Sequence, residues 1–253
     1  MATMWGGIGA TYILKNVRYF PRRVPFILAK YLTWGSRWAR FVRVPTLTPT
    51  LRDQFGQIDI YLFDQLLKGR ISPGMRILDA GCGAGRNLVY LLREGYEVYA
   101  ADSDAQSVES VRSLARMLAR AVLPVSNFRV EAVEHMSFDD ACADVVISSA
   151  VLHFARDDAH FESMLQGSWR VLKPGGLFFS RLGSTIGMES QVERIEGRRH
   201  KVPDGSERYL VDAALLSSIT GRLGAELVDP LKTTVVDNQR AMTTWVLRKK
   251  QTG

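Results

Sequence analysis

The spacing of apolar residues along the chain predicts strands that alternate with helices. Short apolar runs indicate buried strands, and between them apolar residues recur at helical spacing. This alternation favours right-handed crossovers and a parallel sheet covered by helices on both faces, a doubly wound α/β fold. The predicted strands are 75–80, 96–101, 128–130, 145–149, 177–180, 225–228 and 242–248, and the predicted helices are 55–66, 87–93, 103–121, 161–172 and 210–223.

Polar residues and glycines mark where several of these elements begin and end. Thr50 with Asp53 fits an N-terminal cap for the first helix. Ser103 with Gln106 has the spacing of a capping box, and predicts the start of the helix after the second strand. Residues 184–208 are polar and charged without a clear period, so we expect an insertion there.

A glycine-rich segment follows the first strand directly. Gly81, Gly83 and Gly85 stand at alternate positions, where the absence of a Cβ permits a tight bend and a close approach to a ligand. The second strand ends at Asp102, whose carboxylate could accept hydrogen bonds from both hydroxyls of a ribose. An adenosine-containing ligand is therefore expected, with a purely structural turn as the alternative.

The glycine spacing distinguishes between adenosine ligands. Dinucleotide sites usually have G-x-G-x-x-G, whereas this loop has G-x-G-x-G and is preceded by Asp79. A carboxylate at that point would repel a pyrophosphate but could hold a cationic amino group. The pattern favours adenosine joined to an amino acid, and disfavours a nicotinamide-dependent oxidoreductase.

Four motifs in order give this chain a family resemblance. LDAGCGAG at 78–85, Asp102, Glu131 with Ala132, and RVLKPGG at 170–176 together resemble class I S-adenosylmethionine-dependent methyltransferases. The resemblance implies a Rossmann-like, mostly parallel, seven-stranded sheet, with a turn at Pro174–Gly176 before the fifth strand. Residues 83–87 are also loosely similar to the tellurite-resistance-type methyltransferases, whose substrate is not transferred.

The resemblance also implies which residues hold S-adenosylmethionine. The first loop would hold the methionine end, Asp102 the ribose, and Glu131 with Ala132 the adenine edge; the family more often has Asp at the position of Glu131. Ser148 and Ser149 would lie beside the methionine part, or else make only a strand-end hydrogen bond. The predicted cofactor-binding residues are Asp79, Gly81, Cys82, Gly83, Asp102, Ser103, Glu131, Ala132, Ser148 and Ser149.

The expected activity is methyl transfer to a small-molecule acceptor by in-line displacement. Because the sulfonium is already reactive, the protein chiefly aligns the acceptor and excludes water. His153 is the candidate general base, with a packed histidine as the alternative. Tyr61 is the second candidate catalytic residue, with a core position as its alternative. No metal site is expected, because Asp157 and Asp158 near His160 are better explained as the cap and first turn of a helix.

Substrate contacts are expected from segments around this core. The 184–208 insertion could close as a lid, and Arg181 could pair with an acidic substrate or form only a surface salt bridge. The other candidates are Gln57, Asp59, Tyr61, Met188, Arg194 and Tyr209.

Positive charge is concentrated at the start of the chain. Residues 1–52 carry nine Lys or Arg and no acid, whereas the whole chain is +7, which leaves −2 for residues 53–253. We therefore divide the chain into a basic aromatic arm, 1–48, and a methyltransferase domain, 49–253. No nucleic-acid partner is expected, since the domain is slightly acidic.

Three explanations of the arm stay open. Interleaved aromatic and cationic residues suit a peripheral contact with an anionic membrane through residues 1–44. The same residues could pack on the domain or on a second subunit in a homodimer, and a cleaved transit peptide is the third option. A non-catalytic cofactor-binding protein that docks through this arm is the alternative function. The only two cysteines, Cys82 and Cys142, favour a reducing compartment, so a cytoplasmic location is expected.

Overall fold

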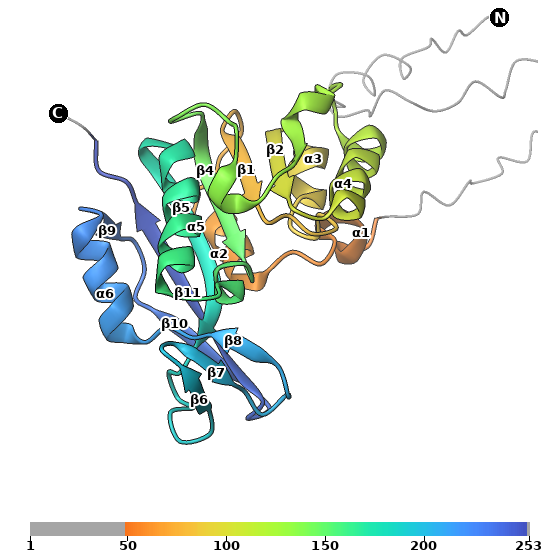
Figure 1. The fold of residues 1–253 in the computed structure, drawn as a ribbon. Coiled ribbons are helices and arrows are strands. Elements are labelled where there is room, and N and C mark those ends of the chain that lie inside the picture. The colour runs from red at the N-terminus through yellow and green to blue at the C-terminus, as the bar shows by residue number, and fades with distance from the viewer. Residues whose placement is uncertain (1–48, 252–253) are drawn as a thin grey trace, which may run out of the picture. The chain divides into compact units, whose positions relative to one another are not determined.

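A computed structural model describes residues 49–251 of the chain, and the predicted arm lies outside the described residues. The described part is built on one large sheet in the order β10-β11-β5-β4-β1-β2-β3, with β9 paired to β11 (Figure 1). The strands of this sheet are β1 (Arg76–Ala80), β2 (Glu97–Asp102), β3 (Phe128–Val130), β4 (Ala143–Ser149), β5 (Leu172–Ser184), β9 (Glu226–Leu227), β10 (Lys232–Val236) and β11 (Arg240–Arg248).

The predicted doubly wound fold is confirmed. Strands β1 to β5 pair in parallel, and β11 pairs antiparallel with β5, β9 and β10. The sheet has eight strands rather than the expected seven, because β9 and β10 pair with successive parts of β11. The helices are α1 (Leu51–Phe55), α2 (Ile60–Leu67), α3 (Val89–Glu94), α4 (Ala105–Leu118), α5 (Asp158–Val171) and α6 (Ala213–Arg222), with short 3-10 turns η1 (Val125–Asn127), η2 (Val133–His135) and η3 (Leu152–Phe154).

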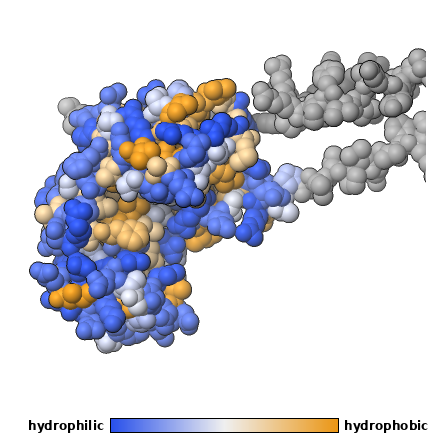
Figure 2. Space-filling model, turned by 45° about the vertical axis from the view of Figure 1, so that its right-hand side comes forward, coloured by the Kyte–Doolittle hydropathy of each residue, from blue (hydrophilic) through white to orange (hydrophobic). Residues whose placement is uncertain are grey.

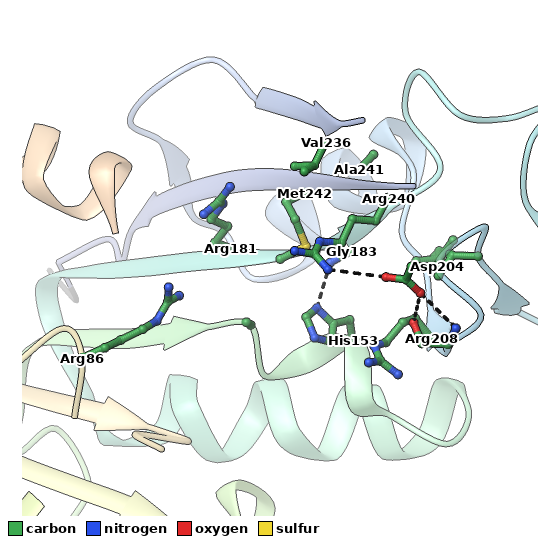
Figure 3. Close-up of a pocket in the computed structure, with 14 residues that line it drawn as sticks. Arg86, His153, Arg181, Gly183, Asp204, Arg208, Val236, Arg240, Ala241 and Met242 are labelled. Carbon is green, nitrogen blue, oxygen red and sulfur yellow. Dashed lines mark hydrogen bonds and ion pairs between the residues drawn. The ribbon is translucent and has the colours of Figure 1, made fainter. Parts of the chain in front are cut away.

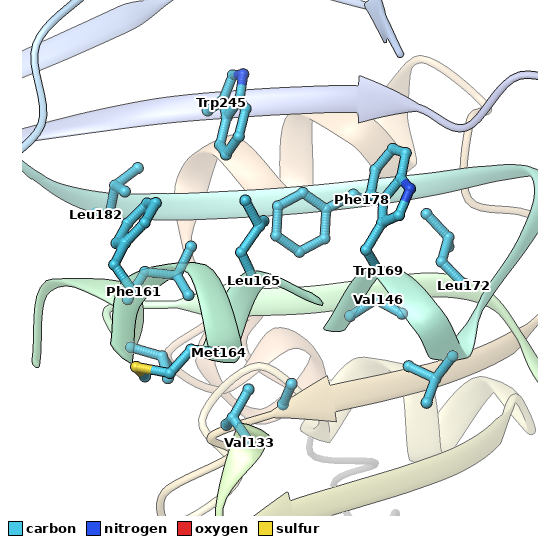
Figure 4. Close-up of a cluster of buried hydrophobic side chains, with 14 of the residues drawn as sticks. Val133, Val146, Phe161, Met164, Leu165, Trp169, Leu172, Phe178, Leu182 and Trp245 are labelled. Carbon is cyan, nitrogen blue, oxygen red and sulfur yellow. The ribbon is translucent and has the colours of Figure 1, made fainter. Parts of the chain in front are cut away.

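Each face of the sheet has its own hydrophobic core. Side chains of β1, β4 and β5 alternate between the faces, so Leu78 and Phe178 pack toward α5 and α6 while Ile77 and Phe179 pack toward α2, α3 and α4. Figure 4 shows the first core, where Trp245 of β11 and Phe178 of β5 lie over the apolar side of α5. This two-sided burial explains why the strands are continuous apolar runs in the sequence.

Two of the predicted helices differ in detail from the structure. The helix expected over 55–66 is interrupted, because Gly56 has φ +65° and Asp59 caps a new helix by accepting from the Tyr61 N–H. The predicted Thr50 cap is confirmed on α1, where Thr50 and Asp53 form a capping box. The helix after β2 is capped by Asp104 rather than Ser103, since the Asp104 carboxylate accepts from two backbone N–H groups.

The expected turn at 174–176 lies within the bounds of β5. Between two pairings of β4 with β5, β4 has one residue, Asp144, whereas β5 has the four residues 173–176, so the chain loops out there. The insertion at 184–208 contains strands that the sequence pattern missed. They form a small antiparallel sheet of β6 (Glu193–Glu196), β7 (Arg199–Lys201) and β8 (Glu207–Tyr209), which lies beyond the carboxyl ends of β4 and β5 (Figure 1).

The face in Figure 2 is largely hydrophilic, with small scattered hydrophobic groups. Within residues 49–251, no helix combines the length and the apolar character that a bilayer span requires.

Candidate cofactor and acceptor site

The carboxyl group of Asp79 lies near the end of β1, directly before the glycine loop. Asp79 is buried, and its Oδ2 makes no hydrogen bond within residues 49–251. Burial is the main cause that raises the pKa of this carboxyl to about 8; the nearby Asp102 adds to the shift and Arg86 opposes it. A buried carboxyl oxygen without a donor is suited to a cationic ligand, because binding would supply the missing partner.

The glycines of the loop have different surroundings. Gly81 has φ +81° and lies against Val151, so that a Cβ there would be 2.4 Å from Val151 Cγ2. Gly83 has φ +50°, and a Cβ there would meet no atom within 4 Å. Gly81 is therefore required by the packing of the protein itself, whereas Gly83 faces open space that a ligand could occupy. Cys82 between them is buried, and burial raises the pKa of its thiol.

The carboxylate at the end of β2 is hydrogen-bonded to this loop. Asp102 accepts from the Gly83 N–H at 2.8 Å and from the Asp104 N–H at 2.9 Å. Each carboxylate oxygen has a further lone pair free for a ligand hydroxyl. Ser103, which is exposed, makes no side-chain hydrogen bond among the described residues.

We expect Asp102→Ala to weaken binding of S-adenosylhomocysteine by about 1 to 3 kcal/mol, because charge-assisted bonds to the ribose would be lost. Titration calorimetry measures the affinity. Asp104→Asn is the matched control, since it changes a neighbouring exposed carboxylate and asparagine caps helices equally well. An unchanged affinity in Asp102→Ala would contradict the assignment of the ribose to Asp102.

The remaining predicted cofactor residues have mixed surroundings. The Glu131 carboxylate accepts from the N–H and the hydroxyl of Ser137, and Ala132 precedes η2. Ser148 is buried, and its hydroxyl has no hydrogen-bond partner in the part of the chain that the structure describes. Its side chain lies on the opposite face of the sheet from Asp79, because Asp79 is in register with Ile147. Ser149 is on the face of Asp79 and accepts a hydrogen bond from Arg86 at 2.9 Å. Of the two serines, Ser149 is therefore the one oriented toward the loop.

A buried carboxylate joins the loop after β1 to β5. Asp59 Oδ2 lies 2.7 Å from Nη1 of Arg181 and 3.7 Å from Nη2 of Arg86. The Asp59 N–H donates to Asn87 Oδ1 at 3.0 Å, which fixes the start of α2 beside the loop. Asp59, which the sequence placed among the substrate contacts, thus positions two arginines, and Arg181 has a buried partner rather than a surface salt bridge.

The Tyr61 side chain contacts β10 and Arg181. The Tyr61 hydroxyl is 2.7 Å from Thr234 Oγ1 of β10, and the Arg181 guanidinium lies 5.5 Å from the centre of its ring. This position supports the arginine through a cation–π contact. The catalytic role stays a prediction.

His153 of η3 lies in the wall of a pocket next to the loop (Figure 3). Its Nδ1 accepts the backbone N–H of Gly183 at 3.2 Å, so the neutral ring carries its proton on Nε2. Burial, together with the charges of Arg208 and Arg240, lowers the pKa of His153 to about 4. The ring is thus neutral near pH 7 and presents an N–H, which favours hydrogen-bond donation over the predicted role as a general base.

The other predicted substrate-contact residues are either packed in the protein or exposed. Met188 is buried, and Tyr209 stacks on Phe161 and donates to Asp158, so both belong to the packing of the insertion. Arg194 and Gln57 are exposed.

Asp157 accepts from the His160 N–H as the N-cap of α5, which confirms the capping interpretation. No cluster of three or more metal-ligating side chains occurs among residues 49–251.

Sequence reasoning missed the three arginines of the pocket other than Arg181. Arg86 lies between the glycine loop and α3, and this place could have marked it as facing a ligand. Arg208 comes from β8, and Arg240 from the start of β11. No sequence signal joins these last two to the site, because their approach depends on how the insertion packs on the main sheet.

Residues 78–180 match the family described as the methyltransferase domain. An uncharacterized methyltransferase of Synechocystis is 35% identical over 152 residues, which are 58% of this chain and 65% of that protein. Malonyl-[acyl-carrier protein] O-methyltransferase of Herminiimonas arsenicoxydans is 35% identical over 144 residues, 56% of this chain and 51% of that protein. This chain therefore spans between half and two thirds of the length of these curated relatives.

The fold is also found among solved structures. The 1,6-didemethyltoxoflavin-N1-methyltransferase of Burkholderia thailandensis, solved with 1,6-didemethyltoxoflavin and S-adenosylhomocysteine, has a TM-score of 0.56 at 19% identity and covers 74% of this chain and 76% of its own. At this identity, the likeness concerns the fold. Residues 78–180 thus match a methyltransferase domain, and the strand order and the loop after β1 agree with the Rossmann-like fold that the sequence motifs predict.

Proposed function

We propose that this protein transfers the methyl group of S-adenosylmethionine to a small-molecule acceptor. The observation that carries the proposal is the buried, unpartnered Asp79 oxygen beside a loop with open space at Gly83. These residues fit a cationic nucleoside: Asp79 would hold the amino group, the backbone at 81–83 the methionine end, and Asp102 the ribose hydroxyls. Ser103, Glu131 and Ala132 would border the nucleoside, as the family resemblance implies.

The protein's own part in the reaction is binding, orientation and exclusion of water. The bound sulfonium supplies an activated methyl group. Arg86 and Arg181, fixed by Asp59, form one wall between the cofactor loop and the pocket that contains His153. A wall fixed in this way lowers the entropic cost of aligning an acceptor with the methyl group. The Herminiimonas relative and the structural neighbour carry names with different acceptors, so no acceptor is transferred to this chain.

Two measurements test the proposed function. Titration calorimetry should show binding of S-adenosylmethionine and S-adenosylhomocysteine, and no binding of NAD. Release of labelled methyl groups to members of a small-molecule library then separates an enzyme from a non-catalytic cofactor-binding protein. Binding of NAD in preference to S-adenosylhomocysteine would contradict the proposal.

The membrane contact, the homodimer and the cytoplasmic location stay predictions, because the arm lies outside the described residues. If the arm is a membrane contact, deleting residues 1–44 should reduce association with vesicles of anionic lipid and leave the affinity for S-adenosylhomocysteine unchanged. Vesicle sedimentation measures the first quantity, and titration calorimetry the second. Equal sedimentation of the full chain and the truncated chain would assign the arm another role.

A further inference from the structure

The pocket that contains His153 has a volume of about 270 Å³ and is bounded by parts of the chain that are far apart in sequence. Arg86 from the loop after β1 and Arg181 from β5 lie on one side, and Arg208 from β8 and Arg240 from β11 lie on the other (Figure 3). We call this the arginine pocket. It borders the cofactor loop through Arg86, so an occupant would lie next to the proposed methyl donor.

The arginine pocket has more positive than negative charge. Asp59 is shared by Arg181 and Arg86, and Asp204 lies 3.5 Å from Arg240. Arg208 lies over the ring of Phe154 at 4.9 Å, and no carboxylate within residues 49–251 forms a salt bridge with it. Four guanidiniums face two carboxylates, which leaves two positive charges in a partly enclosed space. Such a site favours an anion and repels a cation.

The other groups of the pocket agree with an anionic occupant. His153 is neutral and presents its Nε2–H, because Nδ1 is held by the Gly183 N–H. Guanidinium groups and a ring N–H are donors only, and guanidinium geometry matches carboxylate and phosphate oxygens. The apolar part of the lining comes from Val202, Leu210, Val236 and Met242. The pocket therefore combines anion donors with a surface for an apolar group.

We propose that the methyl acceptor is a small organic anion, a carboxylate or a phosphate ester with an apolar part, held in the arginine pocket by Arg208, Arg240 and the His153 Nε2–H. This inference rests on the proposed methyltransferase function and specifies its substrate class. Arg86 and Arg181 act as positioning residues at the border with the cofactor, since Asp59 already compensates part of their charge.

Small probes that share a phenyl group and differ in the charge of their polar group test the inference. The full chain is saturated with S-adenosylhomocysteine, and phenylacetate, phenyl phosphate and neutral phenylacetamide are titrated while binding is followed by NMR. The two anions should bind at least about tenfold more tightly than the amide. Phenylacetate and phenyl phosphate as separate arms distinguish a carboxylate site from a phosphate site.

Arg208→Gln should remove most of this preference, because no carboxylate among the described residues forms a salt bridge with Arg208, so its loss leaves no unpaired carboxylate there. Arg116→Gln on α4 is the control: it makes the same charge change at an exposed position away from the pocket. Thermal unfolding and S-adenosylhomocysteine affinity are measured for both variants, so that a folding defect or a loss of cofactor binding is recognised separately.

The two levels of the proposal fail in different ways. If S-adenosylhomocysteine does not bind, the proposed function fails. If it binds while the anions and the amide bind equally, or while none binds up to about 10 mM, the substrate class is wrong. An anion preference that persists in Arg208→Gln would likewise overturn the assignment of this pocket.

Discussion

Asp79→Asn is expected to lower the affinity for S-adenosylmethionine by roughly 10- to 100-fold, because a buried charge-assisted contact with the cationic amino group would be lost. The wild-type Oδ2 has no partner within the described residues, so the ligand would be its first one. The amide that replaces it carries no charge, and one of its two polar atoms is a donor that a cation repels. Titration calorimetry of the two proteins measures the difference.

Protonation of the Asp79 carboxyl should also be linked to folding stability. Its pKa is raised by burial from 3.8 to about 8, so between about pH 4 and pH 8 the folded protein retains a proton that the unfolded chain has released. Folding stability therefore falls as the pH rises through this window, and the loss by pH 7 is on the order of 4 kcal/mol. Asp79→Asn should lack this part of the pH dependence. Urea unfolding of both proteins at pH 5 and pH 8 measures it.

Cofactor binding should lower the pKa of the Asp79 carboxyl, whereas burial raises it. A bound cation favours the ionised carboxylate, so binding near pH 7 should release close to one proton in the wild type and almost none in Asp79→Asn. Calorimetry in two buffers with different ionisation enthalpies measures the number of protons. Equal proton release by the two proteins would show that Asp79 does not meet the positive charge of the ligand.

Alanine at the two loop glycines should affect different properties. In Gly81→Ala the new Cβ would lie 2.4 Å from Val151 Cγ2 at φ +81°, and we expect a loss of roughly 2 to 4 kcal/mol in the free energy of unfolding. In Gly83→Ala the Cβ would point into open space at φ +50°, so the loss should be only about 1 kcal/mol. Cofactor affinity should nevertheless fall at least about tenfold in Gly83→Ala, since the methyl group would occupy the proposed ligand space.

A double-mutant cycle separates the clash from the backbone strain. Val151→Ala removes both Cγ atoms that the Gly81→Ala Cβ would meet, so the double variant should be more stable than the sum of the two single effects predicts. Urea unfolding of the four proteins measures this coupling. Additive effects would mean that the loop moves away from Val151. Equal cofactor affinity in Gly83→Ala and the wild type would contradict the proposal that the ligand occupies the space at Gly83.

The order of strands and helices could be predicted because the strands are buried on both faces. Phe178 and Phe179 face opposite cores, so a continuous apolar run was sufficient to indicate a strand. Element ends were less predictable. The break between α1 and α2 depends on Asp59, whose carboxylate is held by Arg181, 122 residues later in the chain. Local propensity carries no information about such a partner.

The candidate site also has a part that could be predicted from the sequence and a part that could not. The residues on the loop after β1 and at the end of β2 are close in the fold because parallel strands end at one edge, so Asp79, Gly83 and Asp102 could be brought together from their spacing alone. The arginine pocket could not be predicted, since Arg208 and Arg240 reach it from the 184–208 insertion and from an antiparallel strand. The small sheet of β6, β7 and β8 also has no clear alternation in sequence, because most of its residues are exposed.

A crystal structure of the protein grown with S-adenosylmethionine would show directly where the cofactor binds. We expect the ribose hydroxyls within hydrogen-bond distance of the Asp102 carboxylate, the amino group against Asp79, and the methyl group directed toward the arginine pocket. A loop that stays empty at saturating concentration, or that binds the compound with its adenosine away from Asp102, would contradict this expectation.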